Sequence, residues 1–253
     1  MTGEHSITLT GKVALVTGGS RGLGRSIAHR LCEAGCDVIV NYVASDEAAQ
    51  LTVKEMSDLP GTALAHKGDA RDPAVVAELV DLLRTRYGRL DILVHNAATW
   101  KPMSAARPRV AELWSELSLA LDPLLHGMPD FVDLMAGRSG RIVAVSGNGA
   151  HEVIPGYVAV GVSKAALESL VRYLAVDLAK LGITVNAVAT SMLDKGAETA
   201  NPEMAVFLAT RSPSGRLTRP DDVADAVALL CAEEAGWIQG QVLMVDGGLG
   251  LRA

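Results

Sequence analysis

Short apolar runs alternate with longer amphipathic stretches along the whole chain of 253 residues. Seven of the runs have the length of buried strands and are bounded by turn residues. We expect strands at 13–16, 36–40, 62–67, 90–94, 141–145, 183–188 and 241–245. Strands that alternate with helices need crossover connections, which indicates an α/β fold with a mostly parallel, doubly wound, seven-stranded sheet and helices on both faces.

Capping residues and apolar positions three or four apart predict where the helices lie. Ser45 is expected to cap a helix that runs to about Asp58, and Asp72 with Pro73 begins the next one. A long helix is predicted from near Tyr157 to Leu181. The region 110–135 is helical in pattern but contains Pro123, Gly127 and Pro129, and proline breaks or kinks a helix interior.

The first strand leads directly into a glycine-rich turn, Thr17-Gly18-Gly19-Ser20-Arg21-Gly22-Leu23-Gly24. Glycine permits the tight dihedrals of such a turn and the close approach of a ligand phosphate. The N–H groups and the dipole at the start of the next helix favour a bound pyrophosphate. Because the turn lies between a strand and an amphipathic helix, it predicts a dinucleotide site.

Composition narrows the class of protein. A net charge of −6 and a pI near 5.5 argue against nucleic acid or an anionic membrane as partner. Cys32, Cys36 and Cys231 form no C-x-x-C pair, which favours buried thiols in a reducing compartment. The six histidines show no metal-ligand spacing, and no apolar run is long enough to cross a membrane. We therefore expect one cytoplasmic domain over residues 1–253, without a metal.

Several further motifs occur in a fixed order along the chain. With the glycine turn they are Asp69, Asn96-Ala97-Ala98, Ser146, Lys164 with Ala-Ala-Leu-Glu after it, Val185-Asn186-Ala187-Val188, and Val245-Asp246-Gly247-Gly248. Together they resemble the short-chain dehydrogenase/reductase family from about Leu9 to Gly248. The resemblance implies a Rossmann-type fold, a nicotinamide cofactor, hydride transfer, and a homodimer or homotetramer.

The chain departs from that family at its catalytic positions. The family spaces its tyrosine and lysine Y-x-x-x-K, but Val160 stands four residues before Lys164 and Tyr157 stands seven before it. This longer spacing is similar to that of enoyl-acyl carrier protein reductases, especially their third, NADPH-using type. Gly147 occupies the family's serine position with Ser146 beside it, and Leu119 falls near the position of its helix asparagine.

Three side chains remain as catalytic candidates: Tyr157, Lys164 and Ser146. Lys164 is expected to hold the nicotinamide ribose and to depress the pKa of a nearby phenol. Tyr157 is expected to donate a proton, and Ser146 to orient the substrate carbonyl. The alternatives are a core tyrosine and a turn-forming serine, in which case water or a hydroxyl of the substrate supplies the proton.

The cofactor is expected to be NADPH. NAD-binding chains usually carry an acidic residue after the second strand, whereas this chain has Asn41-Tyr42 there. Arg21 in the glycine turn can hold a 2′-phosphate bidentately. The predicted cofactor-binding residues are Gly18, Ser20, Arg21, Gly22, Leu23, Gly24, Asn41, Tyr42, Asp69, Ala70, Asn96, Ala97, Ala98, Lys164, Ser191 and Met192.

The predicted substrate region combines small residues with apolar ones. Its members are Trp100, Gly147, Asn148, Met192 and Phe207, and residues 193–219 are expected to form a mobile lid. A roomy apolar site fits a flat, bulky substrate. We therefore predict an NADPH-dependent ketoreductase acting on a polycyclic aromatic (angucyclinone-type) polyketide. The alternatives are an enoyl-acyl carrier protein reductase, for which Lys101, Arg107 and Arg109 offer a basic landing patch, and a non-catalytic NADP-binding protein.

Overall fold

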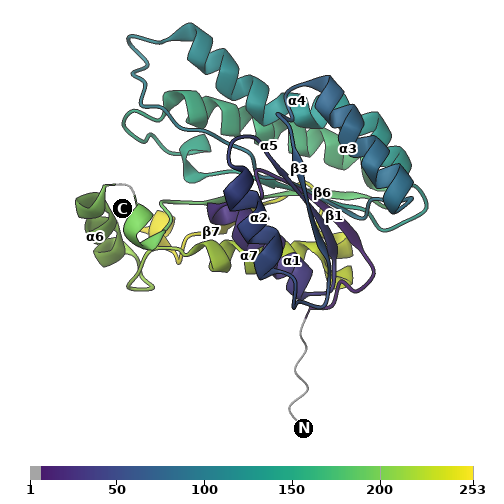
Figure 1. Ribbon diagram of the computed structural model, residues 1–253. Helices are drawn as coiled ribbons and strands as arrows, with labels where there is room; N and C mark the ends of the chain where they lie inside the picture. Colours follow the sequence, from purple (N-terminus) through teal and green to yellow (C-terminus); the bar gives the residue numbers. More distant parts are fainter. Residues whose placement is uncertain (1–6, 200, 253) are drawn as a thin grey trace.

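The computed structural model describes residues 7–199 and 201–252. Within these residues seven strands form one sheet in the order β3-β2-β1-β4-β5-β6-β7, and all six neighbouring pairs are parallel. The predicted doubly wound α/β fold is therefore confirmed (Figure 1). The strands are β1 (Val13–Thr17), β2 (Asp37–Tyr42), β3 (Ala63–Lys67), β4 (Ile92–His95), β5 (Arg141–Val145), β6 (Thr184–Thr190) and β7 (Val242–Val245).

Helices cover both faces of this sheet (Figure 1). They are α1 (Gly22–Glu33), α2 (Asp46–Glu55), α3 (Pro73–Arg86), α4 (Val110–Met135), α5 (Val158–Leu178), α6 (Pro202–Arg211) and α7 (Pro220–Cys231). One core joins α1 and α7 to the sheet, and the other joins α3, α4 and α5 to its opposite face. Alternate strand residues point to opposite faces, which is why both cores draw on the same strands.

The predicted helix starts are confirmed by their caps. Ser45 Oγ accepts a hydrogen bond from Ala48 N at 3.2 Å, and Asp72 Oδ1 accepts one from Ala74 N at 2.9 Å. Each cap satisfies an N–H group that has no partner within the helix. The helix after Ser45 ends at Glu55, a turn before the predicted Asp58. All three cysteines are buried free thiols, as their spacing predicts.

Helix α4 corrects the prediction that prolines interrupt it. The helix runs without a break from Val110 to Met135, with Pro123 and Pro129 inside it. Pro123 is buried and borders a small space beside His95, Leu124 and Phe131. The helix continues although Pro123 cannot donate to the carbonyl of Leu119, and it buries Leu124 and Phe131 in the core on this side. Among the described residues, no helix is both long and apolar enough to span a membrane.

The segment expected to form a lid leaves the sheet after β6. It carries α6, which has no buried residue, and lies beside the C-terminal end of the chain (Figure 1). Its two ends meet where Asp194 N donates to the carbonyl of Thr218 at 2.8 Å. The segment is closed at its base, and its role as a mobile lid stays a prediction.

Candidate active site

The turn between β1 and α1 leaves an open surface at the place where the sequence predicts a phosphate. Gly22 has a φ of +52°, and nothing lies within 4 Å of the position that a Cβ would occupy. Gly18 and Gly24 are needed for packing instead. A Cβ on Gly18 would lie 3.0 Å from Ala97 Cα, and a Cβ on Gly24 would lie 2.1 Å from Gly18 O. The free space at Gly22 and the start of α1 together fit a pyrophosphate.

A set of hydrogen bonds between β1 and β4 holds this turn in place. Thr17 Oγ1 accepts from the backbone N–H groups of Asn96 (3.0 Å) and Ala97 (3.1 Å) and lies 3.1 Å from His95 Nδ1. Asn96 Nδ2 donates to the carbonyls of Thr17 and Gly18, each at 3.1 Å. The side chain of Asn96 therefore shapes the turn, and its contribution to a cofactor site is indirect.

His95 is a neutral structural residue. Thr17 Oγ1 already accepts two N–H groups, so its own proton faces His95 Nδ1 and leaves the imidazole proton on Nε2. Burial lowers the pKa of His95 to about 3, although the backbone carbonyls of Ala120 and Leu119 favour protonation. Leu119 is the residue whose carbonyl Pro123 leaves without a helix partner. Local packing, rather than catalysis, accounts for this histidine.

Asn41 and Tyr42, the last two residues of β2, both form hydrogen bonds within the chain. Asn41 is buried, and its side-chain Nδ2 donates to Gly68 O at 2.9 Å. The backbone carbonyl of Asn41 accepts from Gly19 N at 2.9 Å. Tyr42 donates its hydroxyl to Asp46 at 2.8 Å. Both side chains are thus engaged within the protein, whereas Arg21 is exposed at the start of α1. Arg21 is the predicted residue best placed for a 2′-phosphate.

Asp69 also has a partner within the chain. Arg71 Nε lies 3.0 Å from each carboxylate oxygen of Asp69 and lowers its pKa, while Arg71 NH1 donates to Ser115 Oγ at 3.1 Å. The pair therefore links the loop after β3 to α4. Ala70 beside it is buried.

Two hydroxyl groups at the end of β6 lack partners. The buried Oγ1 of Thr190 and Oγ of Ser191 make no hydrogen bond within the described part of the chain. Buried polar atoms are normally satisfied, so unpaired ones at the carboxyl end of a strand indicate a polar ligand. Ser191 and Met192 accordingly stay predicted contacts.

Lys164 reaches from α5 to the end of β5. Its side chain is buried, and Nζ donates to the carbonyl of Val145 at 2.7 Å. Burial lowers the pKa of Lys164 to about 8, while the negative charges of Glu116 and Glu168 oppose this shift. An ammonium group with so low a pKa can change its charge near neutral pH, which is typical of functional sites.

Tyr157 lies immediately before α5, as its N-cap residue, and is half-buried. A Cβ on Gly149 would lie 2.6 Å from a carbon of the tyrosine ring, so the ring packs against that glycine. The expected fall in the phenol pKa is wrong for this structure: burial, followed by the charge of Glu116, raises the pKa of Tyr157. The phenol is therefore held in its protonated, donating form.

Ser146 donates its hydroxyl to a carboxylate that the sequence analysis missed. The partner is Glu168 Oε1 at 2.6 Å, and the second oxygen of Glu168 lies 2.7 Å from His151 Nε2. A serine has a single O–H donor. While Glu168 accepts it, Ser146 cannot also donate to a substrate carbonyl as predicted.

Glu116 is a second missed carboxylate. It is buried in α4, hydrogen-bonded to Thr99 Oγ1, and its charge acts on both Tyr157 and Lys164. The helix pattern of the sequence could have indicated both carboxylates. Glu116 continues the buried stripe of α4 through Ala120 and Leu124, and Glu168 lies among the buried positions of α5. Carboxylates on the buried face of a helix are unusual unless they have a role.

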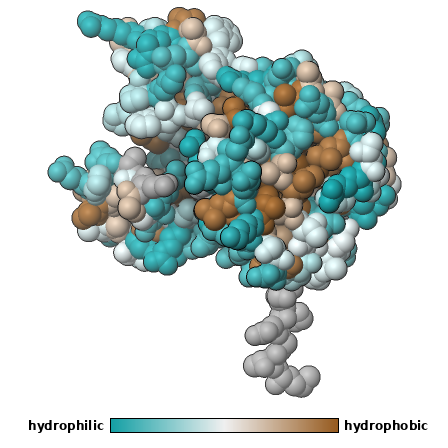
Figure 2. Space-filling view, viewed as in Figure 1, coloured by the Kyte–Doolittle hydropathy of each residue, from teal (hydrophilic) through white to brown (hydrophobic). Residues whose placement is uncertain are grey.

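The predicted substrate residues come from separate segments. Gly147 and Asn148 follow β5, Trp100 follows β4 and is 53% exposed, and Phe207 is on α6 and is 51% exposed. Figure 2 shows the surface hollowed between the projecting segment before α4 and the region of α6. The first of these segments is joined to the catalytic region because Met103 N donates to Gly156 O at 2.8 Å.

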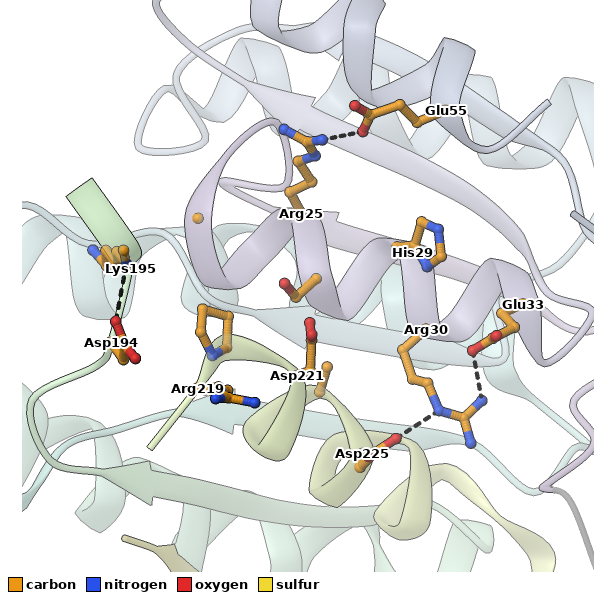
Figure 3. Close-up of a pocket in the computed structure, with 15 residues that line it drawn as sticks. Arg25, His29, Arg30, Glu33, Glu55, Asp194, Lys195, Arg219, Asp221 and Asp225 are labelled. Atoms are coloured by element: carbon orange, nitrogen blue, oxygen red, sulfur yellow. Dashed lines mark hydrogen bonds and ion pairs between the residues drawn. The ribbon is translucent and has the colours of Figure 1, made fainter. Parts of the chain in front are cut away.

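An open groove of about 1000 Å³ lies between α1 and α7 and extends to Gly22 and Asp194 (Figure 3). It contains none of Ser146, Tyr157 or Lys164. Its charged side chains largely pair with one another: Arg25 with Glu55, and Arg30 with both Glu33 and Asp225. Because the groove contains none of the three catalytic candidates, we assign the chemistry to the carboxyl ends of the strands.

The fold and the site together define a Rossmann-type, dinucleotide-binding oxidoreductase architecture. A family model described as "Enoyl-(Acyl carrier protein) reductase" matches residues 18–250. The 1-cyclohexenylcarbonyl-CoA reductase of Streptomyces collinus is 37% identical, with 96% of this chain and 88% of that protein covered. A hydroxynaphthalene reductase-like protein of Metarhizium robertsii is 34% identical, with 97% of each chain covered.

A solved structure agrees with these relatives. A short chain dehydrogenase from Burkholderia cenocepacia, in complex with NADP, superposes with a TM-score of 0.88 at 34% identity and covers 96% of this chain and 99% of its own. The chain belongs to the short-chain dehydrogenase/reductase family. The expected family is thereby confirmed.

Proposed function

We propose that this chain is an NADPH-dependent reductase that saturates the double bond of an enoyl thioester. Arg21 supports the choice of NADPH, because it is exposed at the start of α1 with no acidic residue directly after β2. The relative crystallised with NADP supports the same choice. When bound, NADPH supplies the hydride. The protein must then position the acceptor, stabilise its developing charge and provide a proton.

The observation that carries this proposal is the hydrogen bond from Ser146 to Glu168. With Ser146 occupied and Gly147 at the family's serine position, Tyr157 is left as the predicted hydroxyl donor for substrate. Addition of hydride to the β-carbon of an enoyl thioester places negative charge on the thioester oxygen. One protonated phenol can stabilise that oxygen. The raised pKa of Tyr157 keeps its proton in place for this task.

Lys164 completes the proposed arrangement. Its ammonium group is fixed to Val145 O and has two further N–H groups for the nicotinamide ribose. The enolate that results takes a proton at its α-carbon, from water or from Tyr157, to give the saturated thioester. The first relative above and the description of the matching family both name this type of reductase.

A second candidate is reduction of a ring ketone in a polycyclic aromatic substrate. It is favoured by the open space at Gly147, where a Cβ would meet no atom nearer than Thr190 O at 3.5 Å. The exposed Trp100 and Phe207 would contact a flat ring system. The hydroxynaphthalene reductase-like relative supports this reading. Phenolic hydroxyls on such a substrate would relax the demand for a proton from the protein.

The deciding experiment offers NADPH carrying deuterium at the transferred position to two substrates in parallel. One is a short trans-2-enoyl-CoA, and the other is an angucyclinone-type ketone. We expect a saturated thioester with deuterium on the β-carbon, detected by mass spectrometry and NMR. Deuterium on a carbinol carbon of the polycyclic product, with no change in the thioester, would establish the second candidate. NADPH binding without turnover of either substrate would indicate a non-catalytic protein.

A further inference from the structure

Glu168 is a buried carboxylate with both of its oxygens in use. Its side chain is 2% exposed and projects from α5 one turn after Lys164. Oε1 accepts the hydroxyl of Ser146 at 2.6 Å, and Oε2 lies 2.7 Å from His151 Nε2, at ion-pair distance. Ser146 is itself buried, whereas 55% of the His151 side chain is exposed. The carboxylate therefore joins an interior hydroxyl to a ring at the surface.

These two contacts hold both ends of one short segment, residues 146–151. The segment contains the 3₁₀ turn Asn148–Ala150, and the N–H group of Ala150 donates to Gly147 O at 3.0 Å. Its middle residue, Gly149, packs against the ring of Tyr157. The carbonyl oxygen of Gly149 also approaches α5 closely, because a Cβ added to Gly161 would lie only 2.6 Å from it. A shift of this segment would consequently remove the surface against which Tyr157 packs.

The energetics make the His151 contact more than a surface ion pair. A carboxylate taken out of water is costly unless its oxygens are hydrogen-bonded. Removal of the imidazole would leave Oε2 of Glu168 without its protein partner, and the outer end of the segment would lose its attachment to α5. Because His151 is half-exposed, the same change removes little apolar packing. Substitution of His151 should therefore loosen residues 146–151 without creating a cavity in the core.

We propose that Glu168 and His151 are positioning residues that clamp residues 146–151 onto α5 and so hold the Tyr157 ring in place. The inference rests on the role proposed for Tyr157, whichever double bond is reduced. It assigns no direct contact with substrate to either residue. It also gives Ser146 a structural task, as the inner anchor of the clamp.

The first test uses the protein without cofactor. Hydrogen exchange measured by mass spectrometry is compared for wild type, His151→Ala, His151→Gln and His126→Ala. His126 is an exposed histidine on α4, so its alanine variant serves as the control. We expect faster exchange over 146–157 in His151→Ala alone, since glutamine keeps an N–H donor for Glu168. Unchanged exchange there, or an equal rise across the whole protein, would overturn the clamp.

The second test is a double-mutant cycle on turnover with Tyr157→Phe. We expect His151→Ala to lower kcat about tenfold, as loss of one charged contact to a buried carboxylate would, with the dissociation constant of NADPH unchanged. In the Tyr157→Phe background the same substitution should have no further effect. An equal loss in both backgrounds would show that His151 acts independently of Tyr157. If Tyr157→Phe alone retains full activity, the proposed function fails while the exchange experiment still judges the clamp.

Discussion

Lys164 Nζ donates to the carbonyl of Val145, the last residue of β5, across 2.7 Å. This contact fixes the ammonium group of a helix residue to the carboxyl end of a strand, where ligands of doubly wound sheets bind. The side chain is almost completely buried, and the carboxylates of Glu116 and Glu168 act on its charge. The electrostatics of the site are therefore centred on this lysine.

Activity should fall as the pH rises through about 8. Burial lowers the pKa of Lys164 to about 8, so the side chain is a cation below that pH and becomes neutral above it. If the cation holds the nicotinamide ribose, kcat/KM should decline on the alkaline side while the acidic side is unaffected by this group. A pH profile of kcat/KM measures this directly. The residual activity of Lys164→Met should show no such decline.

Replacing Glu116 with glutamine should move that decline to lower pH. The negative charge of Glu116 raises the pKa of Lys164, so its removal lets burial lower the pKa further. Glutamine has nearly the same shape, and its amide oxygen can still accept from Thr99. The same pH profile measured for Glu116→Gln tests the shift. A profile superimposable on wild type would show that Glu116 does not act on the lysine.

Tyr157→Phe should lower kcat by about 10²–10⁴-fold, the usual contribution of a general acid. The change removes one hydroxyl and leaves the ring to pack against Gly149. NADPH affinity, followed by fluorescence titration, should stay the same. A variant that turns over within a few-fold of wild type would show that the proton comes from water or from the substrate.

Arg21→Ala should weaken NADPH binding by about ten- to a hundredfold, which is the effect of losing a charge-assisted contact to phosphate. NADH lacks the 2′-phosphate, so its dissociation constant should be nearly unchanged. Arg138→Ala, at an exposed position between α4 and β5, is the matched control. If NADPH and NADH bind equally well to wild type, the phosphate assignment is wrong.

The fold and the glycine-rich turn after the first strand could be predicted from local sequence patterns. Buried parallel strands need continuous apolar runs, and such runs stand out whatever the tertiary context. The run at 141–145 coincides with the observed strand. Caps are equally local, because Ser45 and Asp72 bond to N–H groups only two or three residues away. These features could be predicted because each depends on neighbours in sequence.

Tertiary structure decided which polar groups meet. Ser146 and Glu168 are 22 residues apart, and Lys164 and Val145 are 19 apart, so neither pairing is visible in a local pattern. The direction of the Tyr157 pKa shift likewise depends on burial and on Glu116, which comes from another helix. The sequence predicts an interruption of α4 at Pro123, but the helix is continuous there and buries Leu124 and Phe131 in the core. The strands could be predicted from local hydrophobicity, whereas the chemistry of the site depends on charges and donors that only folding brings within a few ångströms.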